Sequence, residues 1–333
     1  MSLMYCDSFD NYDSFPGGKW SSGVGGFNPG ARTGIQAFIP QPEGFAGVPR
    51  INFSNRITMI VGVAIKLVGG TEGSLFSFYN SAGNVGYGGL GAYSDGSIRL
   101  KDYTGAVVAS SPPGIVSEGE YFYVEEKITM TAGGTVVVRV NGQTVITYVG
   151  FTPQAPYDGA DGFLLEGELI FDVFCDDFYL CDDSGTVNND FLGPVRIYAV
   201  TPDANETPLD FTPLSGTNFS EVNQVPPPGD AAYVSAALPG NIDQYHYTPT
   251  GPPGVFVIKG VQHSFSCRLD EPGAHTMASQ VNANTGPNPT VGSNAPDTDY
   301  AFVITPYDVN PNTGLPFQVG DFATTWFGPN ITS

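Results

Sequence analysis

The stretch that decides the fold is residues 135–149, TVVVRVNGQTVITYV, in which two alternating runs flank Asn141-Gly142. Asn-Gly supplies the two positive φ values that a type I′ turn requires, so the stretch predicts a β-hairpin with a two-residue loop. Such a loop fixes the register and builds one mostly apolar face. The expected cross-strand pairs are Val140 with Gln143, Val138 with Val145 and Val136 with Thr147.

Strand and turn signals of the same kind continue on both sides of this hairpin. Short turns are expected at Asp95-Gly96 and Thr104-Gly105. Many short strands joined by tight turns are typical of an antiparallel sandwich, so residues 1–184 are expected to form an antiparallel β-sandwich. The further expected strands are Arg56 to Val68, Ser74 to Tyr79, Tyr121 to Met130 and Leu169 to Leu180.

Length and composition agree with an all-β chain of two sandwich domains. The chain has 333 residues, which at roughly 150 residues per domain suggests two domains. It contains 43 Gly and 28 Pro, and only 14% of its residues are charged, which excludes a long helix or coiled coil. With 23 Phe and 17 Tyr it has enough apolar surface to build cores.

The composition of the sequence changes after Cys181-Asp-Asp-Ser-Gly185, where a predicted strand is followed by polar, glycine-containing sequence. Residues 185–333 are therefore predicted to be a smaller, Pro/Gly-rich β domain. The segment His275 to Asp299 is polar and shows little periodicity, which predicts a long surface loop for assembly contacts. The strands expected in this half are Val195 to Val200, Gly254 to Phe265 and Tyr300 to Thr305.

Charge limits the partners. The formal net charge is −21, with an excess of acids in both halves and no basic patch in the sequence, so nucleic-acid binding is not expected. No run approaches the roughly 18 apolar residues of a membrane span, and the first ten residues do not resemble an export signal. We therefore expect the chain to fold in a cytoplasm, without a membrane span.

The four cysteines are expected to be free, buried thiols. Cys175 and Cys181 lie on one predicted strand, where six steps of about 3.3 Å separate their Cα atoms by roughly 20 Å, against a limit of about 7 Å for a disulfide. Cys6 could pair with either one only if the first and last strands of the domain are neighbours. Cys267 belongs to the other half.

No catalytic motif is present in the sequence, so no catalytic residue is assigned and an enzyme is not expected. The nearest approach is the run Glu166, Glu168 and Asp172, since a retaining glycosidase needs two carboxyl groups about 5 Å apart. Its spacing departs from the tight pattern that sandwich-type glycosidases use. A glycoside hydrolase is therefore an outside alternative.

The acids that follow this run have two further interpretations. Carboxylates at the end of a strand can bind Ca²⁺, and the candidate ligands are Asp176, Asp182 and Asp183. A solvated acidic edge, which discourages aggregation between strands, explains the same residues without a metal. No other cofactor is expected.

Glu126 conflicts with its pattern, because alternation places it on the apolar face of its strand with Phe122, Val124 and Ile128. An unpaired buried carboxylate costs several kcal/mol. Glu126 is therefore expected either to meet a cation such as Arg139 or Lys101, or to lie at a sheet end that water reaches. The second arrangement is the expected one.

Several motifs resemble those of a known family. They include YCDSFDNY at residues 5–12, ARTG at 31–34, YVEEKI at 123–128 and FCDDFYL at 174–180. Together these resemble the laminin-G-like, concanavalin-type sandwiches of bacteriophage structural proteins, and FLGPVRI at 191–197 and the end of the chain extend the resemblance. The resemblance implies that residues 1–184 form a concanavalin-like (LamG-like) antiparallel jelly roll and that the chain is a virion component, and it supplies no catalytic residues.

Two functions follow as hypotheses. In the first, the chain is a phage virion structural protein, a head decoration or fibre, neck or tail component, that homo-oligomerises and docks on capsid, neck or tail proteins. It would then be located in the virion after synthesis in the host cytoplasm.

In the second hypothesis, the lectin-like sandwich makes the chain a glycan-binding adhesin or receptor-binding protein for a host-surface glycan. Four tyrosines lie beside glycines or at turns and are candidate stacking platforms. Ordinary sheet and turn packing is the alternative explanation for them. The four are Tyr79, Tyr87, Tyr93 and Tyr103.

Overall fold

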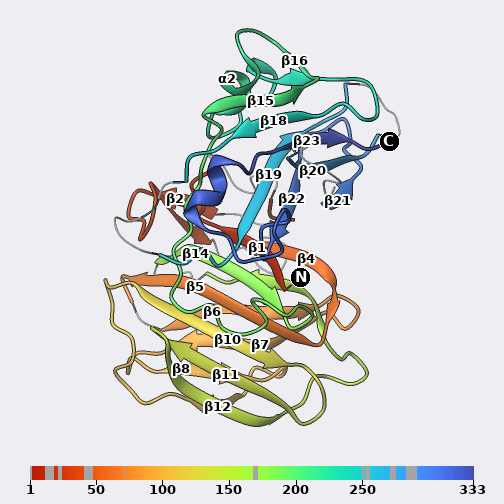
Figure 1. Ribbon diagram of the computed structural model, residues 1–333. Helices are drawn as coiled ribbons and strands as arrows, with labels where there is room; N and C mark the ends of the chain where they lie inside the picture. The colour runs from red at the N-terminus through yellow and green to blue at the C-terminus, as the bar shows by residue number, and fades with distance from the viewer. Residues whose placement is uncertain are drawn as a thin grey trace. The chain divides into compact units, whose positions relative to one another are not determined.

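The computed structural model describes residues 2–11, 19–21, 25–40, 48–70, 72–167, 172–249, 251, 256–270, 275–282 and 291–333. The described chain is almost entirely β and divides into two compact units, Met4–Ile197 and Tyr198–Ser333 (Figure 1). The prediction of an all-β sandwich protein is confirmed. Among the described residues, no helix has both the length and the apolar character needed to cross a membrane.

The first unit contains an eight-stranded sheet whose centre is the pair β5 and β14. The strands predicted at residues 56–68 and 121–130 form β5 and β10, with ends that differ by one or two residues. The strands in order are β12 (Gln143–Phe151), β11 (Gly134–Val140), β10 (Phe122–Thr129), β5 (Thr58–Val68), β14 (Asp172–Asp182), β3 (Ala37–Pro40) and β2 (Gly25–Asn28), and β1 (Leu3–Asp7) pairs with β14.

A six-stranded antiparallel sheet forms the other layer of this unit. The chain crosses between the sheets several times, since β5 and β10 belong to the larger sheet while the segment between them builds most of the smaller one. In order, the six strands are β4 (Arg50–Arg56), β13 (Ala160–Leu165), β6 (Gly73–Asn80), β7 (Val85–Ala92), β8 (Ile98–Lys101) and β9 (Val107–Ser110).

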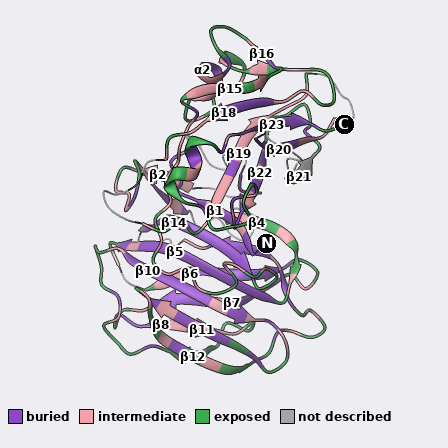
Figure 2. Cartoon of the chain, in the orientation of Figure 1, coloured by how far each residue is buried: buried purple, intermediate pink, exposed green. Residues whose placement is uncertain are grey.

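Aromatic side chains hold the two sheets together. The ring of Phe163 on β13 lies 5.1 Å from that of Phe178 on β14, and Phe163 also contacts Phe76 and Phe78 of β6 at 5.5 Å. All four side chains are fully buried, and Figure 2 shows the buried residues concentrated along the strands of this unit. Burying rings of this size stabilises a sandwich by several kcal/mol.

The hairpin is present, but its predicted register is only partly correct. Asn141 and Gly142 have φ values of 50° and 79°, as the type I′ turn requires, and Val140 faces Gln143. A β-bulge between Val138 and Arg139 then shifts the pairing by one residue. As a result, Val138 faces Ile146 and Val136 faces Tyr148, so the expected pairs with Val145 and Thr147 are wrong.

The boundary predicted after residue 184 is too early, because the segment that follows belongs to the first unit. Leu192 N–H donates to the hydroxyl of Tyr179 at 3.2 Å, and Gly193 N–H donates to Glu125 Oε1 at 2.8 Å. Ile197 N–H donates to Asp177 Oδ1 at 2.7 Å. The strand expected at residues 195–200 is absent, since this segment bonds to side chains and joins no sheet.

The second unit is built on a five-stranded sheet with short additional elements. Its order is β15 (Ala204–Leu209), β18 (Asp243–His246), β23 (Phe327–Ile331), β20 (Met277–Val281) and β21 (Val291–Asn294). The strand expected at residues 300–305 is confirmed as β22, whereas the one expected at 254–265 begins later, as β19, and residues 252–255 lie outside the described chain. The other elements are two strand pairs, β16 (Thr212–Pro213) with β17 (Val234–Ser235) and β19 (Val261–Cys267) with β22 (Ala301–Tyr307), and the short helices α2 (Asn218–Val222), η1 (Gly229–Ala231) and η2 (Val319–Ala323).

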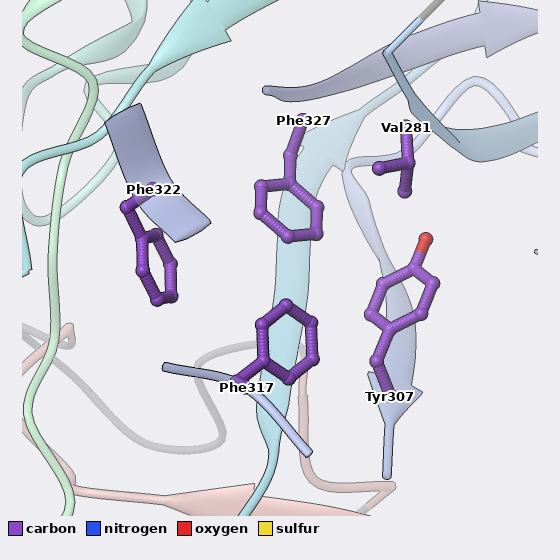
Figure 3. Close-up of a cluster of buried hydrophobic side chains, with 5 residues drawn as sticks. All are labelled: Val281, Tyr307, Phe317, Phe322 and Phe327. Carbon is purple, nitrogen blue, oxygen red and sulfur yellow. The ribbon is translucent and has the colours of Figure 1, made fainter. Parts of the chain in front are cut away.

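A small apolar cluster forms a core of this second unit (Figure 3). The ring of Phe327 lies 5.6 Å from that of Tyr307 and 6.4 Å from that of Phe322, and Phe317 stacks on Phe322 at 5.9 Å. Val281 of β20 completes the cluster. The side chains come from several separate segments, which explains why no single stretch of sequence identified this core.

The prediction of a surface loop over residues 275–299 is wrong for two parts of it, since 277–281 and 291–294 are strands of the five-stranded sheet. Met277–Val281 is β20, which pairs with both β23 and β21, and Ser279 is fully buried. Its hydroxyl binds Nδ1 of His263 at 2.7 Å and the hydroxyl of Tyr307 at 2.7 Å. Polar residues that satisfy one another inside the fold gave this strand the composition of a loop. Residues 283–290 lie outside the described chain.

Candidate functional site

The four predicted glycan-binding tyrosines do not form one platform. Tyr87 is fully buried in the core, where its hydroxyl donates to the carbonyl of Tyr157 at 2.7 Å, so the expectation that it is an exposed platform is wrong. Tyr103 is 41% exposed in the turn after β8. Only Tyr79 and Tyr93 lie on the outer face of the six-stranded sheet.

The predicted calcium ligands are also separated. Asp176 and Asp182 lie on β14 six residues, or roughly 20 Å, apart, and Asp183 is exposed. Asp182 binds Nε of Arg56 at 2.8 Å. Among the described residues, no three His, Cys, Asp or Glu side chains gather closely enough to hold a metal ion.

The middle of the acidic run is not a solvated edge either, because β14 lies inside its sheet and Asp176, Asp177 and Asp182 are buried. Asp176 Oδ2 accepts hydrogen bonds from the backbone N–H groups of Arg32 and Thr33 at 2.7 and 2.8 Å. Asp177 Oδ2 accepts bonds from Arg32 Nη1 at 2.6 Å and from Thr33 Oγ1 at 2.9 Å. Burial and the neighbouring charge of Asp177 raise the pKa of Asp176. This network joins three segments and has a structural role.

The glycosidase alternative receives no catalytic pair from the described residues. Glu166 Oε1 accepts a hydrogen bond from Ser77 Oγ at 2.6 Å, and Asp172 is exposed at the start of β14. Glu168 lies outside the described chain.

A more informative surface is the outer face of the six-stranded sheet, which we call the glycine face. On β7, Tyr87 and Leu90 point into the core, and the positions that face outward are Gly86, Gly89 and Gly91. Because β6 and β7 are the two middle strands, the centre of this face has a floor with few side chains.

The first two of these glycines are not required by the backbone. A methyl group at Gly86 would approach no heavy atom closer than 3.6 Å, and one at Gly89 none closer than 3.8 Å. Neither has a φ in the left-handed region. A methyl group would fit at both positions, and strands normally disfavour glycine, so these two glycines keep side chains off this part of the sheet.

Side chains with hydrogen-bonding groups surround this floor. The apolar Ile98 and Leu100 of β8 face the core, so Arg99 and Lys101 face outward, and Lys101 lies directly opposite Gly89. From the other side of the sheet, Arg50 of β4 extends over β6. The glycine face consists of Arg50, Ser77, Tyr79, Gly86, Gly89, Gly91, Tyr93, Arg99, Lys101 and Glu166.

An arginine side chain stacks on each of the two tyrosines of this face. The Arg50 guanidinium carbon lies 4.4 Å from the ring centre of Tyr79, and Tyr79, which lies beneath this arginine, is only 5% exposed. The Arg99 guanidinium carbon lies 4.0 Å from the ring centre of Tyr93. Stacking of this kind fixes the plane of a guanidinium group and points its N–H groups outward from the edge of that plane. Arg99 uses these groups to bind Asp95 and Ser97. Both tyrosines therefore position cations.

The sequence analysis missed Arg50, Arg99, Lys101 and the role of Glu166. Part of the signal was available, because IRLK at residues 98–101 alternates apolar and basic residues and so places both bases on one face. The contribution of Arg50 had no local signal, since it joins this face only through the pairing of β4 with β13 and of β13 with β6.

Comparison of the sequence with protein families and with curated proteins finds no match. Among solved structures, alginate lyase Aly36B is similar to 54% of this chain over 96% of its own length, with 16% identity and a TM-score of 0.37. The carbohydrate-binding module CBM66 from Bacillus subtilis matches 49% of this chain and 96% of its own, at 10% identity and a TM-score of 0.35. Sheep galectin-11 matches 41% and 99%, at 12% identity and a TM-score of 0.30. At these values the likeness assigns none of these proteins' activities to this chain.

Proposed function

We propose that the first unit is a carbohydrate-binding module and that the glycine face is its binding surface. The observation that carries the proposal is the side-chain-free floor at Gly86 and Gly89, which no steric or backbone requirement explains. Sugars bind to such surfaces through hydrogen bonds from a few fixed polar groups and through contact with flat, open surface.

The groups around the floor suit this task. Arg50, Arg99 and Lys101 are donors, while the carboxylate of Glu166 accepts hydrogen bonds from hydroxyl groups. Ser77 already occupies one oxygen of Glu166 and so holds that carboxylate in place. The proposal is for binding without bond cleavage, in keeping with the absence of a catalytic motif in the sequence.

Filling the floor tests the proposal. In the full-length protein, Gly89→Phe should abolish binding to a glycan array or to purified host-surface polysaccharide, because its ring would occupy the space above β7. The matched control is Gly26→Phe on β2 of the other sheet, where a methyl group meets no atom within 4 Å. It should leave binding unchanged.

Three outcomes would contradict the proposal, one for the surface, one for the function and one for binding without cleavage. Binding that survives in a folded Gly89→Phe variant would place the glycan elsewhere, and the absence of any glycan ligand for the native protein would refute the function. Release of sugar from a bound polysaccharide would show an enzyme.

The sequence resemblance supports a second proposal, that the chain is a virion structural protein that oligomerises and docks on capsid, neck or tail proteins. A glycan-binding unit would be compatible with such a place, since it would make the particle adhere to its host. Purified virions should then contain a band at 35.2 kDa in many copies on a denaturing gel. Absence of the chain from virions would refute this second proposal.

A further inference from the structure

Two of the bases that have no acid partner lie together on the glycine face. The protein has 33 acids and only 12 bases, so each base has many carboxylates available. Among the described residues, ion pairs with acids are formed by Lys19, Arg32, Arg56, Arg99, Lys127 and Arg268. In the same part of the chain Lys66, Arg139 and Arg196 form none, and neither do Arg50 and Lys101, which share one face of the six-stranded sheet.

The immediate surroundings of these two cations leave them with unused donors. Nε of Arg50 is buried and has no hydrogen-bond partner in the described chain. Lys101 Nζ has one long contact, 3.4 Å to Ser74 Oγ, and lies 6.0 Å from the ring centre of Tyr93. A cation left without an acid in such an acidic protein is suited to an anion from outside.

The charged ends of both cations lie over β6. The Arg50 guanidinium group stacks on Tyr79, and Lys101 Nζ lies 3.4 Å from Ser74 Oγ. Tyr79 and Ser74 are five residues apart on β6, or roughly 17 Å at about 3.3 Å per residue. A ligand that contacts both cations must therefore be a chain that runs along β6 and the neighbouring glycine floor of β7.

We propose that the ligand of the glycine face is an acidic polysaccharide with carboxylate groups, anchored at one end by Arg50 and at the other by Lys101. This inference rests on the proposed carbohydrate-binding function and specifies its substrate class. The planar carboxylate matches the fork of a guanidinium group, and Tyr79 holds the guanidinium group of Arg50 in place for it.

The overall charge of −21 is compatible with this class of ligand. At physiological ionic strength a charge acts over about 8 Å, so the two nearby cations dominate what a bound carboxylate experiences. The acid of this face, Glu166, lies next to the floor and restricts the ligand further. It repels an anionic group at its own position and accepts hydrogen bonds from hydroxyl groups there.

The experiment measures binding of the full-length protein to polygalacturonate and to the same polymer with its carboxyl groups reduced to alcohols. The native protein should bind the acidic polymer at least tenfold more tightly, and added salt should narrow the difference. Arg50→Gln and Lys101→Gln should each weaken acidic-polymer binding about tenfold and leave binding to the reduced polymer unchanged. Lys127→Gln, which makes the same charge change on β10 of the other sheet, is the matched control.

Chain length provides a second readout. Oligogalacturonates of increasing length should gain affinity sharply once they reach both cations, and the gain should vanish in Lys101→Gln.

Equal affinity for the acidic and the reduced polymer would overturn the inference while leaving the carbohydrate-binding function intact. Failure to bind either polymer, combined with binding to an unrelated neutral glycan, would overturn it in the same way. Failure to bind any glycan would refute the proposed function itself. Equal loss of affinity in Lys127→Gln and Lys101→Gln would show only a general charge effect and would also overturn the inference.

Discussion

Two buried acidic regions of the first unit have opposite surroundings. Both side-chain oxygens of Asp177 on β14 accept hydrogen bonds. Oδ2 accepts from the Arg32 guanidinium and the Thr33 hydroxyl, and Oδ1 accepts from the N–H of Ile197. Glu126 on β10 is equally buried, yet neither of its carboxyl oxygens has a partner in the described chain. The comparison shows that burial alone does not decide what an acid does. Its partners decide whether it joins segments of the fold through hydrogen bonds or is buried without any.

The expected place of Glu126 at a hydrated sheet end is therefore wrong, and so is the alternative of a cation partner. Glu126 pairs with Val61 and Val138 in the middle of β10. Desolvation raises the pKa of its carboxyl group well above the usual value. Across the core, Gly88 of β7 has a φ of +60°, and a methyl group there would be crowded by two atoms, Ile128 Cδ1 at 2.6 Å and Glu126 Oε1 at 2.7 Å. The glycine makes room for the acid.

The largest expected effect on stability comes from removing residues 184–197, whose backbone binds buried charged side chains. A fragment ending at Ile197 should unfold cooperatively. A fragment ending at Asp183 should be much less stable, because it lacks the N–H groups of Gly193 and Ile197 and the Val195 carbonyl that binds Arg32. Each lost bond to a charged group costs about 1.5–3 kcal/mol, and a typical domain has only about 5–15 kcal/mol of stability. Chemical denaturation of both fragments measures this. Equal stability would show that residues 184–197 play no part in the unit.

The next effect is Asp177→Ala, which leaves Arg32 and Ile197 N–H without their acceptor. Removing one partner of a buried pair should lower the free energy of unfolding by about 3–5 kcal/mol. Urea unfolding at neutral pH measures the change. The control is Asp183→Ala on an exposed carboxylate, which should change stability by less than about 0.5 kcal/mol. A small effect of Asp177→Ala would mean that water replaces these bonds.

Glu126→Gln should instead raise the free energy of unfolding, and this gain should depend on pH. In the folded protein Glu126 keeps its proton at pH values where the unfolded chain has lost it, so the native protein should lose stability as the pH rises above the unfolded pKa of about 4.5. Relative to the native protein, the variant should gain about 1.4 kcal/mol per pH unit, or ~3 kcal/mol between pH 5 and pH 7, while the folded pKa lies above this window. Unfolding curves at these pH values check it. A gain independent of pH would show that the carboxyl group titrates normally.

The smallest expected effect is a coupling between Gly88 and Glu126. Gly88→Ala should destabilise the unit by about 1–2 kcal/mol, because of the positive φ and the contact with Glu126. In the Glu126→Ala background the cost should fall by about 0.5–1 kcal/mol, since one of the two crowded atoms is gone. A double-mutant cycle of unfolding free energies measures the coupling. Strict additivity would show that the two residues do not touch.

Much of the fold followed from local sequence. The turn at Asn141-Gly142 was predictable because its φ values depend on two adjacent residues. The register beyond it was not, since the bulge between Val138 and Arg139 depends on how the whole sheet twists. Buried Ser279 shows the same limit, because its partners His263 and Tyr307 come from other strands.

The candidate site divides in the same way. Tyr79 and Tyr93 were identified from turn and glycine context, but that context also selected Tyr87, which points into the core. The contacts with Arg50 and Arg99 that give Tyr79 and Tyr93 their role were not visible in the sequence. Only the order of strands in the six-stranded sheet brings β4, β6 and β8 to one surface.

The sequence by itself determined that this chain is all-β, where its strongest hairpin turns, and that its charge is acidic, since these depend on composition and on neighbours along the chain. Tertiary structure decided which acids are paired, which glycines form an open floor, and which cations lack an acid. These properties depend on residues far apart in sequence, such as Arg32 and Asp177, which are 145 positions apart and which no local pattern relates. Arg50 reaches the binding surface only through the pairing of β4 with β13 and of β13 with β6.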